Sequence, residues 1–343
     1  MQRLKEEDGA IAVVTAVVLV VLVGMLALVL DVGNLYWERR QLQNGADAAA
    51  LAAARDLASG SGGTAYATAR QYANDNNPRG AFVGPSDFVT TSSSVQVTAR
   101  TGSLAAAGQL PSIFAGVLGV NGYATSATAR VTWGNIGSGT TIPLAICGHA
   151  WNTMTSNGTV LPSGPPDQIL RIGVPPGHVT PGIDCSNPGA GDPPPGGFGF
   201  LSADGNCQAT MDVGNWMPGA NGNTPDIGGS SPCGVNQLYA MLHNIVTTNQ
   251  TVLVPIFGEY KNQGSTGSYQ IVGFGAFRLL GYSVNGGPSP SNPAHGRVVS
   301  WSGSCPGSAT CLRGYFTNFV SLDGVVAGPS VPSYGATVIS LTN

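Results

Sequence analysis

The most regular pattern along the chain is an uninterrupted apolar run at residues 10–30, in which Thr15 carries the one polar side chain. A helix of this length rises about 31 Å, which is enough to cross the hydrocarbon core of a bilayer. Val, Leu and Ile dominate the run, and each favours insertion at mid-span by about 0.3–0.6 kcal/mol. The pattern therefore predicts a transmembrane helix at 10–30, preceded by a short cytoplasmic tail at 1–9.

Two alternative interpretations of this run are a cleaved signal peptide and the core helix of a soluble protein. The apolar region of a signal peptide usually spans about 7–15 residues and ends at a small-residue cleavage site. The run here is longer, and the LDVG sequence at 30–33 has no A-x-A pattern. A core helix at this place is disfavoured because the rest of the chain is poor in long apolar runs. We therefore favour an uncleaved anchor.

Beyond the span, residues 31–58 continue with helical periodicity. A heptad-like series of apolar positions defines one face: Leu35, Leu42, Ala46, Ala49 and Ala53. The many alanines give high helix propensity and a thin face that allows a close neighbour, either another helix or the sheet of the same domain. Gly60, Gly62 and Gly63 are expected to end the helix.

Shorter patterns predict a small α+β unit at residues 31–135, led by this Ala-rich helix. Residues 64–73 read as a second helix. Alternating segments at 88–100 and 123–133 predict strands. Residues 111–120 suit a helix with proline in its first turn.

The distal segment, 136–343, has short apolar stretches separated by loops rich in Gly, Pro and Asn. We predict one helix at 235–246 and a β-sandwich or an irregular β-rich domain. The candidate strands are 142–146, 168–174, 251–257, 269–282, 297–301, 315–322 and 336–341. The predicted fold class is thus α+β: a transmembrane helix continuing into an amphipathic helix, a small pilin-like unit and a β-rich domain.

Cysteine placement predicts the compartment of this distal domain. All of the cysteines lie there and none has the C-x-x-C spacing of a metal site: Cys147, Cys185, Cys207, Cys233, Cys305 and Cys311. An even number in a loop-rich region favours a disulfide framework in an oxidising compartment over free thiols. Proximity favours the pair Cys305–Cys311, and Cys207–Cys233 is a second candidate pair. Because Lys and Arg flank the span on both sides, the cysteines decide the orientation, with the large domain extracytoplasmic.

Charge is scarce. Charged residues make up 9% of the chain, the formal net charge is −3, and no basic cluster occurs. Average globular proteins are about 25% charged. The sequence thus has no electrostatic footprint for nucleic acid, and we predict no nucleic-acid partner. The lipid bilayer is the partner that the apolar run implies.

Motifs for catalysis are scarce as well. The histidines (His149, His178, His243 and His295) form no H-E-x-x-H pair, and there is no G-x-S-x-G elbow or Walker loop. Cys147 and His149 would share a face of a strand and could act as nucleophile and base. A disulfide role for Cys147 is favoured because the other cysteines point to an oxidising setting.

Two further groups of residues suggest ligands. Residues 204–206 and 212–226 carry Asp and Asn that could bind calcium, but they lack EF-hand spacing and are ordinary turn formers. Trp151, Trp216 and Trp301 could form a sugar-stacking platform, although buried core tryptophans are commoner. We therefore predict no catalytic, cofactor-binding or metal-binding residues, no cofactor and no enzymatic activity.

The N-terminal segment resembles a known family. DGAIA at 8–12, DVG at 31–33 followed by Tyr36, and RQLQNGADAAALA at 40–52 are similar to the N-terminal signature of TadE/TadG-like proteins. The resemblance implies a pilin-like protein of the Flp pilus and tight-adherence machinery, with assembly proteins as partners through the N-terminal helix. Pilins cut by prepilin peptidase usually carry Glu five residues after the cut. A cut after Gly9 would put Val14 there, so we expect an uncut or atypical minor component.

The function expected from these observations is pilus assembly or surface adhesion by a non-enzymatic, single-pass protein of the cell membrane. The alternative is a surface binding module for a glycan or host ligand displayed on a membrane anchor. An exported hydrolase with an unrecognised site is a third, less favoured hypothesis.

Overall fold

The computed structural model divides the chain into two compact units. Unit 1 comprises Met1–Thr132 with Ser340–Asn343, and unit 2 comprises Trp133–Ile339. The chain passes from unit 1 into unit 2 within strand β5 (Ser126–Thr141). The residues that the structure describes are 2–112, 114, 116, 119, 121–159, 161, 168–172, 198–219, 233, 235–261, 267–283, 297–298, 310–321, 325–328 and 332–342.

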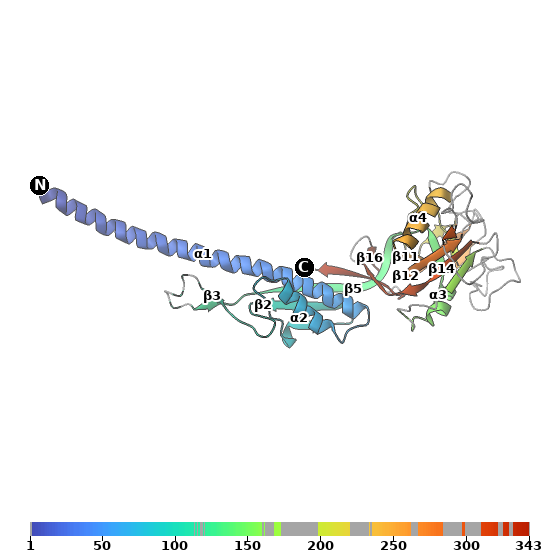
Figure 1. Cartoon of the computed structure of the whole chain (residues 1–343), viewed down its shortest axis with the longest axis horizontal. Helices are drawn as coiled ribbons and strands as arrows, with labels where there is room; N and C mark the ends of the chain where they lie inside the picture. The colour runs from blue at the N-terminus through green and yellow to red at the C-terminus, as the bar shows by residue number, and fades with distance from the viewer. Residues whose placement is uncertain are drawn as a thin grey trace. The chain divides into compact units, whose positions relative to one another are not determined.

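A single helix, α1 (Gln2–Ala58), dominates unit 1 and runs without a break through the predicted span and the heptad segment (Figure 1). The helix ends where the glycines predicted an end, and Gly60 has φ +83°. The Gly60 amide donates to the Leu57 carbonyl at 3.3 Å, and the Ser61 amide donates to the Asp56 carbonyl at 2.8 Å. This pair of bonds is a Schellman motif, which satisfies two of the last helical carbonyls.

A second helix and an antiparallel sheet pack against the C-terminal half of α1. Helix α2 (Ala65–Asp75) and one strand of the sheet, β2, both contact α1. The sheet has the order β1-β2-β5, and the 3₁₀ turn η1 precedes it; the bounds are η1 (Pro85–Asp87), β1 (Phe88–Thr90) and β2 (Ser94–Arg100). Alternate side chains of β2 are fully buried: Val95, Val97 and Ala99. The predicted helix at 64–73 and the predicted strands are therefore confirmed.

The helix predicted to begin at Pro111 is wrong at its start. Leu110–Pro111 forms strand β3, which pairs antiparallel with β4 (Gly122–Tyr123). A Cβ on Gly122 would lie 2.8 Å from the Leu110 carbonyl oxygen, so the two strands cross as closely as glycine allows. Short apolar runs fit a helix and a strand equally well, and here the pairing of the two strands decides. Half of the predicted helix, namely residues 113, 115, 117, 118 and 120, lies outside the described residues.

Unit 2 contains a mixed sheet of order β7-β14-β12-β11-β6-β8, to which β10 and β13 add through β12. The pairs along this sheet are antiparallel except for β6 and β11, which are parallel. The bounds are β6 (Leu144–Cys147), β7 (Gln168–Ile172), β8 (Phe198–Phe200), β10 (Trp216–Pro218), β11 (Thr251–Lys261), β12 (Ser268–Ser283), β13 (Arg297–Val298) and β14 (Thr310–Thr317).

Helix α3 (Gly148–Thr155) contacts β11 and β14, and α4 (Val235–Thr247) contacts β12. Two further strands, β9 (Ala209–Asp212) and β16 (Val325–Ala327), pair antiparallel with residues 136–141 of β5. Strand β17 (Ala336–Thr342), whose last residues count to unit 1, lies between β5 and β15 (Phe319–Ser321) in the strand order. The predicted helix at 235–246 is confirmed. Helix α3 was not predicted from the sequence.

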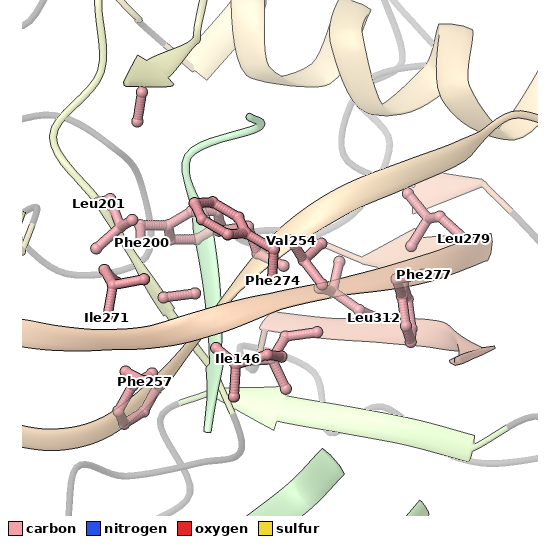
Figure 2. Packing of buried hydrophobic residues seen from close by; sticks show 14 of the residues in the cluster. Ile146, Phe200, Leu201, Val254, Phe257, Ile271, Phe274, Phe277, Leu279 and Leu312 are labelled. Atoms are coloured by element: carbon pink, nitrogen blue, oxygen red, sulfur yellow. The ribbon is translucent and has the colours of Figure 1, made fainter. Parts of the chain in front are cut away.

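The core of unit 2 is a cluster of buried side chains from several strands of the mixed sheet (Figure 2). Its largest fully buried members are aromatic, namely Phe274, Phe277, Phe316 and Tyr282. The phenylalanine rings of residues 277 and 316 pack edge to face with centroids 5.1 Å apart. Burial and the neighbouring Tyr239 raise the pKa of Tyr282 to about 12. The alternating apolar pattern of the distal half thus produces a packed core within a helix-and-strand unit.

A disulfide joins Cys207 to Cys233 and closes a loop of sequence separation 26. This pairing confirms the second candidate pair. Cys147 is disulfide-bonded too, and its sulfur accepts the Ala150 amide at 3.3 Å at the start of α3. The predicted pair Cys305–Cys311 lies outside the residues whose side chains the structure describes.

Candidate functional site

The first half of α1 presents a large apolar surface on all sides. Its large apolar side chains from Ile11 to Leu30 are between 43% and 69% exposed. An 18-residue window of this helix has a mean hydropathy of 3.2 with none of it buried, so by length and composition the helix could cross a membrane. A soluble protein would bury such a helix in its core. The Thr15 hydroxyl donates to the Ile11 carbonyl at 2.8 Å, so this polar group is satisfied within the helix.

The apolar surface ends at a buried carboxylate. Asp31 is 4% exposed, and its two carboxylate oxygens accept the Phe114 amide at 3.4 and 3.2 Å. The Tyr123 hydroxyl donates to the same carboxylate at 3.3 Å. Burial, followed by the charge of Asp31, raises the pKa of Tyr123. The β3–β4 hairpin is therefore held against α1 at the first residue after the apolar run.

A second buried carboxylate lies two turns further along. Glu38 is 1% exposed and accepts the Asn77 side-chain amide at 3.1 Å. Arg79 forms an ion pair with Glu38 at 3.5 Å, donates to the Asn34 side chain at 2.9 Å, and stacks over the Trp37 ring at 4.7 Å from its centroid. Because a buried charge needs partners, these contacts attach the loop after α2 to one face of α1.

Beyond Glu38 the contact surface of α1 consists of small apolar residues. The predicted heptad positions Leu42, Ala46, Ala49 and Ala53 are all fully buried, which confirms the predicted face. A Cβ on Gly45 would lie 2.8 Å from the Ala73 carbonyl oxygen of α2. The helices therefore approach so closely that glycine is the residue that fits at this position. Both neighbours that the sequence allowed, a helix and a sheet, are present.

The calcium candidates do not converge in the described part of the chain. One carboxylate oxygen of Asp204 accepts the amides of Asn206 and Gln208 at 2.9 and 2.8 Å, and Asp212 accepts the Asn215 side chain at 3.3 Å. These bonds are those of ordinary turns. Within the described residues, no group of three or more His, Cys, Asp or Glu could hold a metal ion. Residues 220–226 lie outside the described part.

The other candidates lie apart as well. Cys147 is oxidised in a disulfide and the His149 side chain is exposed, so the pair offers no thiolate nucleophile. Trp151 is 5% exposed and packs edge to face on Tyr334 in the core of unit 2. The Trp216 ring is covered by the Lys261 ammonium at 3.9 Å. The remaining candidates, His178, His295 and Trp301, lie outside the described residues, and His243 is half-buried on α4.

A polar depression in unit 1 is lined by one ionisable side chain, that of Arg130, among four uncharged ones: Gln96, Thr128, Thr132 and Thr342. It therefore offers no acid–base pair. Within the described residues, the candidate functional site is therefore helix α1 itself. Its first half is apolar and exposed. Its second half binds the rest of unit 1 through two buried carboxylates and packs through small residues.

Comparison with known proteins identifies this same helix. Residues 9–56 match the family model described as putative Flp pilus-assembly TadE/G-like. No curated protein and no solved structure matches the chain. The match covers the exposed apolar half of α1 and most of its packed half, and it confirms the resemblance that the motifs of this segment indicated.

Proposed function

From the TadE/G-like match of α1, we propose that this chain is a membrane-anchored, pilin-like protein that takes part in Flp, or tight-adherence, pilus assembly at the cell surface. Its role is mechanical and non-enzymatic, and it contributes to adhesion through the assembled machinery. The observation that carries the proposal is that the matched segment is one continuous helix with an exposed apolar half and a clamped half.

The two halves of α1 have different roles in this proposal. The exposed apolar half lies in the lipid bilayer, where each backbone polar group is satisfied inside the helix. The second half holds unit 1 through Asp31, Glu38 and the small-residue contact at Gly45. Pulling on unit 1 therefore loads the membrane helix directly, with no flexible linker between them.

Unit 2 faces the oxidising side of the membrane in this proposal. The Cys207–Cys233 disulfide supports that placement, because disulfides persist outside the reducing cytoplasm. Assembly proteins bind through the N-terminal helix. Its juxtamembrane surface includes Tyr36, 72% exposed, and Trp37, 40% exposed. Aromatic side chains of this kind are enriched at membrane interfaces and at protein interfaces.

The test combines anchoring with pilus formation in cells of the native organism. A deletion strain is complemented with wild type or with Leu22→Arg/Val23→Arg, whose arginines each cost about 2.5–3.5 kcal/mol at mid-span. We expect the variant to leave the membrane fraction and to abolish complementation. The matched control is Val89→Arg/Val326→Arg, at valines that are 54% and 64% exposed on strands; it should complement.

Three results are informative against the proposal. Recovery of the Leu22→Arg/Val23→Arg variant in the membrane fraction, at the level of the wild type, would show that the helix is not an anchor. Normal pili and normal adhesion in the deletion strain would refute a role in pilus assembly. Failure to co-purify any pilus-assembly component with the wild-type protein from solubilised membranes would refute the expected partners.

A further inference from the structure

The position of the β3–β4 hairpin along α1 is fixed by Asp31. The Phe114 amide and the Tyr123 hydroxyl both donate to this carboxylate, and Asp31 directly follows the last residue of the apolar run. One helical residue corresponds to a rise of about 1.5 Å. The hairpin is therefore held at the level where α1 leaves the apolar stretch.

The hairpin also lies toward the N-terminal side of the other elements of unit 1. In Figure 1, β3 lies beside α1 closer to the N-terminal end of the helix than α2 and β2 do. Ala27 lies one turn before Asp31 on the same helix face, and it is half-buried while the other residues from 11 to 30 are exposed. Protein contact on α1 thus continues into the last turn of the apolar run.

The composition of this region suits lipid. No charged residue occurs between Arg100 and Arg130 in the sequence. Phe114 is 38% exposed, and Gly116 and Gly119 are exposed as well. A charged side chain in hydrocarbon is costly, whereas an aromatic ring at the interface is favoured. Charge is scarce throughout this chain, so what marks the hairpin is the combination of an exposed aromatic ring with a position at the end of the apolar run.

We propose that the β3–β4 hairpin enters the interfacial layer of the bilayer beside α1, with the Phe114 side chain in contact with lipid. Unit 1 is then attached to the membrane at two places, the span and the hairpin. The second contact fixes the tilt of α1 and unit 1, which are packed together, relative to the bilayer surface. The occupant of this surface is lipid because the surface is continuous with the apolar half of α1. The inference rests on the proposed anchoring of α1.

The experiment uses the full chain in lipid nanodiscs, with the photocrosslinking amino acid p-benzoylphenylalanine at one position at a time. The tested position is Phe114, where the probe closely resembles the native ring. Leu26, 59% exposed in the span, is the positive control, and Tyr72, 49% exposed on α2, is the negative control. We expect a yield of lipid adducts at Phe114 that approaches the yield at Leu26 and exceeds that at Tyr72 several-fold, measured by mass spectrometry of the protein.

A second crosslinking position in the hairpin, Gly116, covers the case in which the probe at Phe114 disturbs the local fold. Gly116 is exposed, and the nearest atom to an added Cβ is the Ser112 hydroxyl at 3.3 Å, the end of a side chain that can rotate. Lipid adducts at Leu26 but at neither Phe114 nor Gly116 would overturn the hairpin contact and leave the span intact. Adducts to another protein chain at both hairpin positions, in native membranes, would overturn it in favour of a protein partner. Absence of adducts at Leu26 would refute the span and the hairpin contact together.

Discussion

Helices α1 and α2 approach each other closely at Gly45, and substitution there tests whether small-residue packing holds unit 1 together. In Gly45→Ala the added Cβ would lie 2.8 Å from the Ala73 carbonyl oxygen and 3.6 Å from the carbonyl carbon behind it. The obstacle is backbone, so it cannot rotate away. The matched control is Gly33→Ala on the same helix, where nothing lies within 4 Å of the added atom.

The expected magnitude follows from two opposing terms. Replacing glycine by alanine inside a helix stabilises it by about 1 kcal/mol. Overpacking a tight contact costs about 1–3 kcal/mol. Gly45→Ala should therefore lower the free energy of unfolding of unit 1 by up to about 2 kcal/mol, whereas Gly33→Ala should leave it unchanged or raise it by up to about 1 kcal/mol. Gly45→Val should be more destabilising than Gly45→Ala, since its two methyl groups add to the same overlap.

The assay is pulse proteolysis of the full chain in detergent micelles across a urea series, with fragments of the two units resolved by mass. Unit 2 serves as the internal reference, because its unfolding midpoint should not move. Equal stability of Gly45→Val and Gly33→Val would refute the close approach. If Gly45→Ala stabilised unit 1 as much as Gly33→Ala does, the close approach would be refuted too, because helix propensity alone would then account for the change in stability.

Two further predictions concern one unit each. The Arg100 guanidinium, through its hydrogen bonds, holds the pKa of Asp87 below its usual value. The pair therefore stabilises unit 1 fully above the unfolded-state pKa of about 3.9, and this contribution is lost as the pH falls through the lower folded-state pKa. The free energy of unfolding of unit 1 should therefore fall between about pH 6 and pH 2 in the wild type, and Asp87→Asn should lack this part of the pH dependence. Identical pH profiles of the wild type and Asp87→Asn would contradict the pairing. Reduction of Cys207–Cys233 should destabilise unit 2 by about 2–4 kcal/mol and leave unit 1 unchanged, and an unchanged urea midpoint of unit 2 in reductant would contradict this.

The buried face of α1 could be predicted from the sequence because helical periodicity decides which positions share a face, whatever the neighbour is. Leu42, Ala46, Ala49 and Ala53 are fully buried as the heptad pattern predicted. Leu35, on the same face, is half-buried. It lies one turn after Asp31 and three residues before Glu38, where polar contacts replace apolar packing.

The partners of the two carboxylates could not be predicted, because they are distant in the sequence. Tyr123 lies 92 residues from Asp31, and Asn77 lies 39 residues from Glu38. The sequence does contain a pattern that points to the two carboxylates themselves. Asp31, Glu38 and Gly45 are spaced by seven residues, so two charged side chains occur in the same heptad register as the glycine that contacts α2. Charges at such positions are expensive unless partners cover them.

The hairpin after Pro111 shows where local reasoning reaches its limit. Proline followed by an apolar run has the composition of a helix start, but β3 pairs with β4 instead. Pairing satisfies backbone groups, and the Phe114 amide gains a charged acceptor in Asp31. Helix α3 was missed for a related reason: its start is capped by the sulfur of Cys147, which is not a residue type that signals a helix N-terminus.

The carboxylate of Asp31 links the proposed anchoring of α1 to the folding of unit 1. In a bilayer, an exposed Asp at this point would keep α1 from sliding inward, because burying the charge in hydrocarbon costs about 2.5–3.5 kcal/mol. The hairpin covers that carboxylate with a backbone amide and a tyrosine hydroxyl, and it brings no charge of its own. The hairpin can therefore approach the lipid surface without exposing the charge of Asp31 to it. The same contact would be lost if unit 1 unfolded, so folding of unit 1 and its depth at the membrane are coupled through one residue.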